Sequence, residues 1–163
     1  MSTPAELERA TRVERAQEHE ISVVLALVEE LLAELGQEGR EFAGIDRRRL
    51  QTDLRENLRN HRFLALLAKD AGDTPIGVLT LSVSFALHAG GEYGVIDEIY
   101  VLPAQRNRGV GRKLVAEATA VAKERGWFRL DVTGPGNSAD RRVLHFYEQL
   151  GFGFTGSKLR LLL

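Results

Sequence analysis

The chain has 163 residues, of which 44% are hydrophobic, and this is enough for one domain with a substantial core. Its 22 Lys and Arg residues are balanced by 23 Asp and Glu residues, so the net charge of −1 lacks the basic excess that nucleic-acid binding needs. The absence of cysteine excludes disulfides, thiolate metal sites and a cysteine nucleophile. We therefore expect a single domain over residues 1–163 with no nucleic-acid partner.

The sequence shows no targeting signal. Residues 1–20 are rich in Glu and Arg and lack the apolar stretch of a secretion signal. No later segment approaches the roughly 20 apolar residues that a membrane span requires. This predicts a soluble, cytoplasmic protein that does not act on a membrane.

The first part of the chain predicts a short strand followed by two helices. An extended segment is expected around residues 11–15. Apolar residues then recur every three or four positions over residues 21–35, which predicts a helix that ends at Gly36. Leucines four residues apart predict a second, more polar helix over residues 46–61, with Asp46 as its N-cap.

The middle of the chain changes to a two-residue period, which is typical of strands. Residues 63–68 form an apolar run, residues 70–75 have the composition of a turn, and apolar residues alternate with Thr and Ser over residues 79–85. This predicts a β-hairpin with one buried face. A further strand is expected over residues 95–102, and Pro103 ends it.

The last part predicts two helices that alternate with two strands. One helical stripe begins at Val110 and ends at Gly126, and a second helix covers residues 139–150. Strands are expected over residues 127–133 and 152–163. The order β-α-α-β-β-β-α-β-α-β predicts an α/β (α+β) domain, in which helices cover a mixed sheet.

A glycine-containing loop over residues 106–111, with the sequence RNRGVG, leads into the helix that begins at Val110. Unpaired N–H groups and the helix dipole make such a helix start an anion site, and glycines allow close approach of the anion. The sequence has no Walker A motif, and Leu114 stands where G-x-G-x-x-G needs its last glycine. A tight strand-to-helix turn without any ligand remains the alternative.

Three motifs in the same order resemble the GNAT superfamily of acyl-CoA-dependent N-acetyltransferases. Arg106-x-x-Gly109-x-Gly111 resembles the family's Q/R-x-x-G-x-G/A signature, and the preceding strand ends in Tyr100-Val101-x-Pro103, as in that family. Phe146-Tyr147-Glu148-x-Leu150-Gly151-Phe152 resembles F-Y-x-x-L-G-F. The resemblance is good from residue 63 to the C-terminus. In the first 60 residues it rests only on the pattern of helices. It implies a mixed, mostly antiparallel central sheet flanked by helices, and transfer of an acetyl or other acyl group from acetyl-CoA to a primary amine by direct attack.

The resemblance also implies a set of coenzyme-binding residues. The backbone of Ile99, Tyr100 and Val101 would pair with the pantetheine arm, and the Val101 N–H would donate to the thioester carbonyl. An ordinary internal strand without an open edge is the alternative. Asp140 stands where relatives have a coenzyme-contacting asparagine, which Asn137 or Ser138 could replace. The residues around the pyrophosphate would be Arg106, Asn107, Arg108, Gly109, Val110, Gly111 and Arg112.

Asp97, Glu98 and Tyr147 are the candidate catalytic residues. An amine is mostly protonated at neutral pH, so the reaction needs a proton acceptor. Asp97 takes the position of the family's base and is the first choice, although it could merely bind a neighbouring loop; Glu98 is the second choice and could instead contact a cationic substrate. On a regular strand their side chains would point to opposite faces. Tyr147 takes the position of the tyrosine that protonates the departing thiolate in many relatives, and packing on the sheet is its alternative role.

The remaining expectations concern partners. No metal is expected, because the four histidines lack metal-ligand spacing. The acceptor is a small-molecule or peptide amine that the sequence does not identify. Glu92, Asp97 and Glu98 are consistent with a cationic acceptor, but a solvated charged surface without any role in binding is the stronger interpretation of these residues. Homodimers are frequent among similar proteins. The competing interpretations are a GNAT-like module that binds acyl-CoA without catalysis, and an unrelated α/β domain that binds another phosphorylated ligand.

Overall fold

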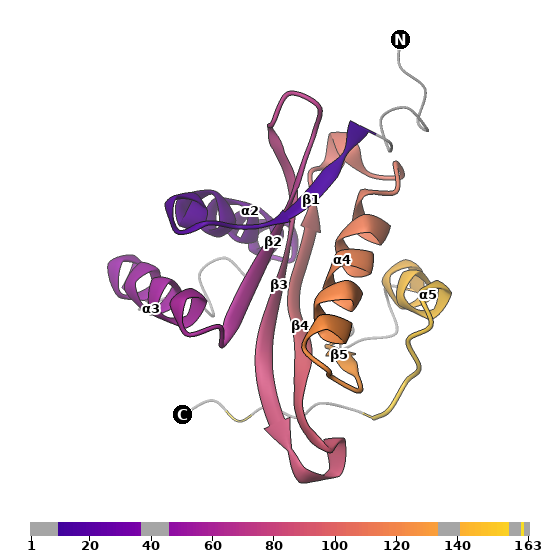
Figure 1. Ribbon diagram of the computed structural model, residues 1–163. Coiled ribbons are helices and arrows are strands. Elements are labelled where there is room, and N and C mark those ends of the chain that lie inside the picture. Colours follow the sequence, from indigo (N-terminus) through magenta and orange to yellow (C-terminus); the bar gives the residue numbers. More distant parts are fainter. Residues whose placement is uncertain (1–9, 37–45, 134–140, 157–160, 162–163) are drawn as a thin grey trace. The chain divides into compact units, whose positions relative to one another are not determined.

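The computed structural model describes residues 10–36, 46–133, 141–156 and 161 (Figure 1). The chain forms two units, Met1–Asp131 and Val132–Leu163, each of which is described by itself. A single domain over the whole chain stays a prediction. The strands are β1 (Arg12–Arg15), β2 (Phe63–Lys69), β3 (Pro75–Ala86), β4 (Gly91–Val101) and β5 (Leu130–Val132). The helices are α2 (Ile21–Glu34), α3 (Arg47–Arg59), α4 (Val110–Glu124) and α5 (Arg141–Gln149), with short 3-10 helices η1 (Glu18–Glu20), η2 (Leu87–Ala89) and η3 (Pro103–Gln105).

The strands form one sheet in the order β1-β2-β3-β4-β5, and the first four pair antiparallel with their neighbours. The predicted fold class, a mostly antiparallel sheet flanked by helices, is therefore confirmed. Asp70 closes the hairpin between β2 and β3, because its carboxylate accepts hydrogen bonds from the N–H groups of Gly72 and Thr74, both at 2.9 Å. This is the turn chemistry predicted for residues 70–75.

Both faces of the sheet are buried near this turn, so the prediction of one buried face is wrong there. Residues 64–69 and 76–81 are all buried. On one face, α2 packs on Val78 and Tyr100. On the other, α4 lies so close that a Cβ added at Gly77 would be 3.4 Å from the Leu114 side chain. A strand covered on both sides needs no alternation of polar and apolar residues.

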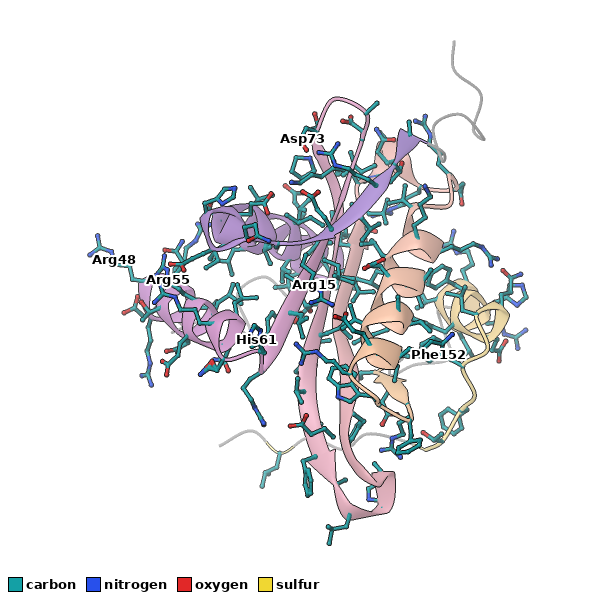
Figure 2. The ribbon with its side chains drawn as sticks, in the orientation of Figure 1. Arg15, Arg48, Arg55, His61, Asp73 and Phe152 are labelled. Carbon is teal, nitrogen blue, oxygen red and sulfur yellow. The ribbon has the colours of Figure 1, made fainter. Side chains whose placement is uncertain are left out.

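The two predicted N-terminal helices are confirmed as α2 and α3. Gly36 has a φ of +65°, which the left-handed end of a helix requires and glycine adopts without strain. The carboxylate of Asp46 caps α3 by accepting from the N–H of Arg48 at 2.9 Å. Figure 2 shows the Arg48 side chain pointing away from the sheet, whereas Arg55 pairs with Glu18 of η1 at 2.9 Å.

β3, β4 and β5 differ in length from the prediction; β3 begins at Pro75, four residues before the predicted alternation over residues 79–85. β4 begins at Gly91, four residues earlier than predicted, because Gly90 ends η2 with a φ of +76° and allows pairing to start at once. β5 covers only Leu130–Val132 instead of residues 127–133. The N–H of Trp127 still bonds to the carbonyl of Ala122, 2.9 Å away, and so belongs to the end of α4 rather than to a strand.

The second unit contains α5, whose described residues agree with the predicted helix over residues 139–150; residues 139 and 140 lie outside the described part of the chain. The expected strand over residues 152–163 is not found at residues 152–156 or 161, where the structure describes that range. One reason is that the N–H of Phe152 is bonded to the carbonyl of Tyr147, 3.1 Å away, at the end of α5. No helix in the described residues is long and apolar enough to cross a membrane.

Candidate active site

A β-bulge in β4 brings the two candidate bases together. One residue of β3, Thr80, lies opposite two residues of β4, Asp97 and Glu98. The pairs on either side of this irregularity are Leu81–Ile96 and Leu79–Ile99. The extra residue interrupts the alternation of side chains along β4.

Both carboxylates consequently lie on the sheet face that α2 covers. Tyr100 packs against α2, and Glu98 precedes it by two residues. On the other side of the bulge, Val95 shares this face with its partner Ser82, and Asp97 follows Val95 by two residues. The expectation that Asp97 and Glu98 point to opposite faces is wrong, because it assumed a regular strand.

Thr80 holds Glu98 through two hydrogen bonds. Its hydroxyl accepts from the Glu98 N–H at 3.0 Å and donates to the Glu98 carboxylate. Thr80 is fully buried and Glu98 is half-buried. Burial raises the pKa of Glu98, the Thr80 hydroxyl opposes this by lowering it, and the charge of Asp97 raises it further. A carboxylate with a raised pKa is a stronger base at neutral pH than an ordinary one.

Asp97 is exposed to solvent, whereas Glu98 is half-buried. Its negative charge contributes to the raised pKa of its neighbour. Two adjacent carboxylates on one face produce a negative potential there, which attracts a cation such as a protonated amine. The geometry therefore gives the two residues different properties, with Glu98 suited to accept a proton and Asp97 suited to attract a charged group.

The end of β4 presents backbone groups on the side away from β3. The N–H of Leu102 points toward β3, where it bonds to the carbonyl of Ile76 at 3.0 Å. The Val101 carbonyl across the same peptide bond points the opposite way and accepts from Nε of Arg106 at 3.0 Å. Because the N–H and C=O of one strand residue share a direction, the N–H groups of Val101 and Ile99 also point away from β3.

Arg106 connects this strand end to α2. Its guanidinium makes two hydrogen bonds with the carboxylate of Glu34, at 2.9 and 2.6 Å, and lies 5.5 Å from the centre of the Tyr100 ring. The guanidinium lowers the pKa of Glu34. The first arginine of the motif thus holds the C-terminal end of α2 against the end of β4, and this bidentate pair fixes its orientation.

The glycine loop has the conformation of an anion site. Asn107 and Gly109 both have positive φ, 60° and 76°, and Gly109 is the N-cap of α4. Val110 is buried and anchors the helix start, and the first intrahelical bond of this turn runs from the N–H of Lys113 to the carbonyl of Gly109. The N–H groups of Val110 and Gly111 lie before this bond, at the positions of a helix start that have no acceptor within the helix and that typically bind anions.

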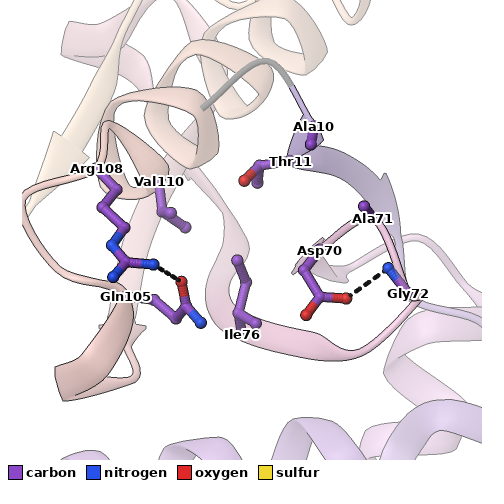
Figure 3. Close-up of a pocket in the computed structure, with 9 residues that line it drawn as sticks. All are labelled: Ala10, Thr11, Asp70, Ala71, Gly72, Ile76, Gln105, Arg108 and Val110. Atoms are coloured by element: carbon purple, nitrogen blue, oxygen red, sulfur yellow. Dashed lines mark hydrogen bonds between the residues drawn. The ribbon is translucent and has the colours of Figure 1, made fainter. Parts of the chain in front are cut away.

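A small cavity of about 140 Å³ lies beside this loop. Arg108 and Val110 line it from the loop side, and Asp70 of the β2–β3 turn and Thr11, just before β1, line it from the opposite side (Figure 3). The Arg108 guanidinium is held by the Gln105 side chain at 3.1 Å. The loop therefore combines two residues of positive φ with a guanidinium that is oriented by a hydrogen bond.

Tyr147 lies in the second unit, on α5, and is buried. Its ring makes edge contacts with the rings of Phe146 and Phe152, with centroids 5.2 and 5.4 Å apart. Burial raises its pKa to about 12, so the hydroxyl stays protonated at neutral pH. Asn137 and Asp140, the other residues expected at the coenzyme, lie outside the described part of the chain.

Two residues of this site were not predicted from the sequence, Glu34 and Thr80. Glu34 is 72 positions from its partner Arg106, and nothing in a single sequence relates them. Thr80 belongs to the alternating Thr and Ser positions of β3, whose pattern suggested an exposed face. In the described residues, no group of three or more His, Cys, Asp or Glu side chains is arranged to hold a metal ion.

Comparisons with known proteins agree on one family. Residues 25–152, more than half of the chain, match the Acetyltransferase (GNAT) family. A GCN5-related N-acetyltransferase from Ralstonia eutropha JMP134 has the same fold, with a TM-score of 0.79 and 19% identity over 93% of this chain and 98% of that chain. A predicted acetyltransferase from Clostridium acetobutylicum, solved with acetyl-CoA, has a TM-score of 0.76 and 20% identity over 93% of this chain and 96% of that one.

A third structure is that of aminoglycoside acetyltransferase meta-AAC0020, from an uncultured soil metagenomic sample, in complex with sisomicin. It has a TM-score of 0.78 and 17% identity over 96% of this chain and 98% of that chain. A search among curated proteins found no match. At these identities the structures establish the fold alone, whereas the sequence match identifies the family. This chain belongs to the GNAT acetyltransferase family.

Proposed function

We propose that the protein transfers an acetyl group from acetyl-CoA to a primary amine by direct attack within a ternary complex. The observation that carries this proposal is the second half of β4, where a half-buried carboxylate of raised pKa is followed by outward-facing N–H groups and then by an anion site. Acetyl-CoA supplies a thioester that an unprotonated amine can attack. A module that only bound acyl-CoA would have no use for a half-buried base, which makes the non-catalytic alternative weaker.

The residues fit the coenzyme as follows. The N–H groups of Ile99 and Val101 would pair with the pantetheine arm, as an added strand does. The N-terminal turn of α4 would bind the pyrophosphate through its backbone. Arg106 is engaged by Glu34 and Val101, so its role would be to hold the loop rather than to bind phosphate directly. Arg108 and Arg112 would add positive charge near the phosphates.

Each proton has a proposed donor and acceptor. Glu98 would remove a proton from the ammonium, directly or through water, and the amine nitrogen would then form a bond to the thioester carbon. The Val101 N–H would donate to the oxygen as negative charge develops on it. As the carbon–sulfur bond breaks, Tyr147 would donate its proton to the thiolate, and the nitrogen would lose its second proton to solvent. The structure favours Glu98 over Asp97 as the base because Glu98 is the more buried and has the raised pKa.

The acceptor class is proposed from the negative face that Asp97 and Glu98 create. It favours an amine that carries positive charge, and one structural neighbour is an aminoglycoside acetyltransferase in complex with sisomicin. Aminoglycosides, polyamines and peptide amines should therefore be screened together for release of the CoA thiol. Activity confined to uncharged amines would contradict this acceptor class.

Saturating acetyl-CoA should raise the thermal midpoint of the folded protein, because a ligand that binds only the native state stabilises it. Gly111→Val should abolish most of this shift, since a branched side chain would stand between the amide donors and the phosphate. The measurements are thermal unfolding with and without coenzyme, and calorimetry for affinity. Gly153→Val is the matched control, because a side chain at Gly153 would meet open space. An unmoved midpoint together with no binding heat would refute the proposed function.

Tyr147→Phe should lower kcat by about 10-fold without changing the affinity for acetyl-CoA, if the hydroxyl protonates the thiolate. The raised pKa keeps the hydroxyl protonated, so this tyrosine should not cause kcat to fall as the pH rises from neutral into the moderately alkaline range. Tyr93→Phe, the same change in a half-buried tyrosine on β4, is the control and should be fully active. Turnover of Tyr147→Phe within twofold of the wild type would instead assign the residue to packing.

A further inference from the structure

We propose that Thr80 is a positioning residue, which holds the β4 bulge open and aims the Glu98 carboxylate through its single hydroxyl. This inference rests on the proposed function, because Thr80 affects the reaction only if Glu98 is the base. The hydroxyl makes both hydrogen bonds at once, accepting from the Glu98 backbone and donating to its side chain. A hydroxyl has one donor and two acceptor sites, so it can do both.

The first step of the argument is the geometry of the bulge. Two residues of β4 face one residue of β3, so the regular ladder cannot satisfy every N–H at this point. The Thr80 hydroxyl replaces the missing ladder acceptor for the Glu98 N–H, at 3.0 Å. Burying an N–H without an acceptor is costly, and a hydroxyl in this place therefore stabilises the irregular strand.

The second step concerns the surroundings of Thr80. Its partner on β2 is Ala65, which is 1% exposed, and α2 covers the same face with Val24 and Leu27. These neighbours of Thr80 have apolar side chains, which cannot donate a hydrogen bond to a carboxylate. Asp97 is the titratable residue that acts on Glu98, and it repels the charge instead of stabilising it. Thr80 is thus the polar group that opposes burial and keeps Glu98 ionisable.

The third step is the consequence for the reaction. The hydrogen bond from Thr80 lowers the pKa of Glu98, against burial and Asp97, which raise it. Without this bond the pKa rises further, and a smaller fraction of Glu98 is ionised at a given pH. Since the base must be ionised to accept a proton, the acid side of the kcat profile should move to higher pH. A residue that contributed only to folding would leave that profile in place.

Thr80→Val, which keeps the shape and removes the hydroxyl, should shift the acid limb of kcat upward by about one pH unit and lower kcat about 10-fold at neutral pH. In Thr80→Ser, which keeps a hydroxyl, the acid limb should stay at its wild-type position and kcat should be within about twofold of the wild type. The matched control is Ser82→Ala, which removes a hydroxyl two residues away on the same face of β3 and should change neither quantity. If Thr80→Val does not fold, Thr80→Ala replaces it, with the same expected shift.

A second measurement does not depend on activity. The pKa of Glu98 can be followed by carbon NMR titration of its carboxyl group, and it should rise by about one unit in Thr80→Val but not in Thr80→Ser. An unchanged Glu98 pKa, or an unchanged kcat profile alongside an impaired Glu98→Gln enzyme, would overturn the role of Thr80 and leave the proposed function intact. A fully active Glu98→Gln enzyme would instead remove Glu98 from the mechanism, while the titration still decides whether Thr80 controls its ionisation.

Discussion

Glu98→Gln should lower kcat by about 10² or more at neutral pH, because the amide cannot accept the proton of the ammonium. The raised pKa of Glu98 predicts an acid limb of kcat in the wild type above the ordinary glutamate value of 4.5. In the variant that limb should disappear, and turnover should recover partly at high pH, where free amine accumulates. The measurement is a kcat profile against pH for both proteins with one amine at saturation.

The same substitution should not destabilise the protein. A folded-state pKa raised above the unfolded value means that ionising Glu98 opposes folding, and this cost is absent below the unfolded pKa and fully present above the raised one. The amide oxygen of glutamine can still accept from Thr80, so the midpoint of Glu98→Gln should equal or exceed that of the wild type. A catalytic defect in a protein of unchanged stability separates the base from a structural residue.

Two further variants serve as comparisons. Asp97→Asn should lower kcat less than Glu98→Gln does and should raise KM for a cationic amine, since it removes an exposed charge. Glu56→Gln makes the same chemical change as Glu98→Gln at an exposed position on α3 and should have no effect. If Asp97→Asn were the more damaging change, the base would be Asp97, and two fully active variants would exclude both residues.

The sequence predicts those parts of the fold that depend on nearby residues. The N-cap of α3 at Asp46 and the left-handed end of α2 at Gly36 follow from local chemistry, and both are confirmed. The loop before α4 is identified by its glycines and by the motif around them. Each of these features is specified within a few residues, and a single sequence contains that information.

The β4 bulge could not be predicted, because it depends on the pairing of β4 with β3. The sequence around Asp97 reads as a regular strand, and only the register reveals that two residues there face Thr80. Which of Asp97 and Glu98 is the better candidate for the base depends on this register. The bidentate pair between Glu34 and Arg106 likewise requires the tertiary arrangement of α2 and β4. Sequence patterns therefore identified the candidate carboxylates, and tertiary structure is needed to rank them.

The β1 end of the sheet contains a buried ion cluster around Lys69. The Lys69 ammonium bonds to the carboxylate of Glu20 at 2.6 Å and to that of Glu14, and lies 3.8 Å from Asp73. Figure 2 labels Asp73 at the β2–β3 turn. Lys69 is 6% exposed and Glu20 is 9% exposed. The Thr11 carbonyl, directly before β1, accepts a hydrogen bond from the Lys113 ammonium at 2.6 Å. The cluster thus anchors the strand that contacts the first turn of α4.

The pKa values of this cluster show that it stabilises the fold over a wide pH range. Burial alone would raise the pKa of Glu20, but the N–H of Gln17 and the Lys69 ammonium outweigh it and lower that pKa. Glu14 and Glu20 raise the pKa of Lys69 above its ordinary 10.5. The glutamate contribution is present above pH 4.5 and is lost as the pH falls through the lowered values; the lysine contribution is complete below 10.5 and is lost at higher pH.

Lys69→Met should therefore cost roughly 3 kcal/mol at neutral pH, because it leaves the Glu20 carboxylate buried without its cation. For a chain of this size that corresponds to a fall in the thermal midpoint of about 6–12 °C. The deficit should shrink in acid, where Glu20 of the variant becomes protonated, and adding Glu20→Gln should recover part of it. Arg47→Met, which breaks an exposed pair with Glu29 at 3.2 Å, is the control and should cost about 0.5 kcal/mol or less. If the two single variants had equal midpoints across the pH range, the Lys69 cluster would behave as a surface ion pair and would not anchor β1.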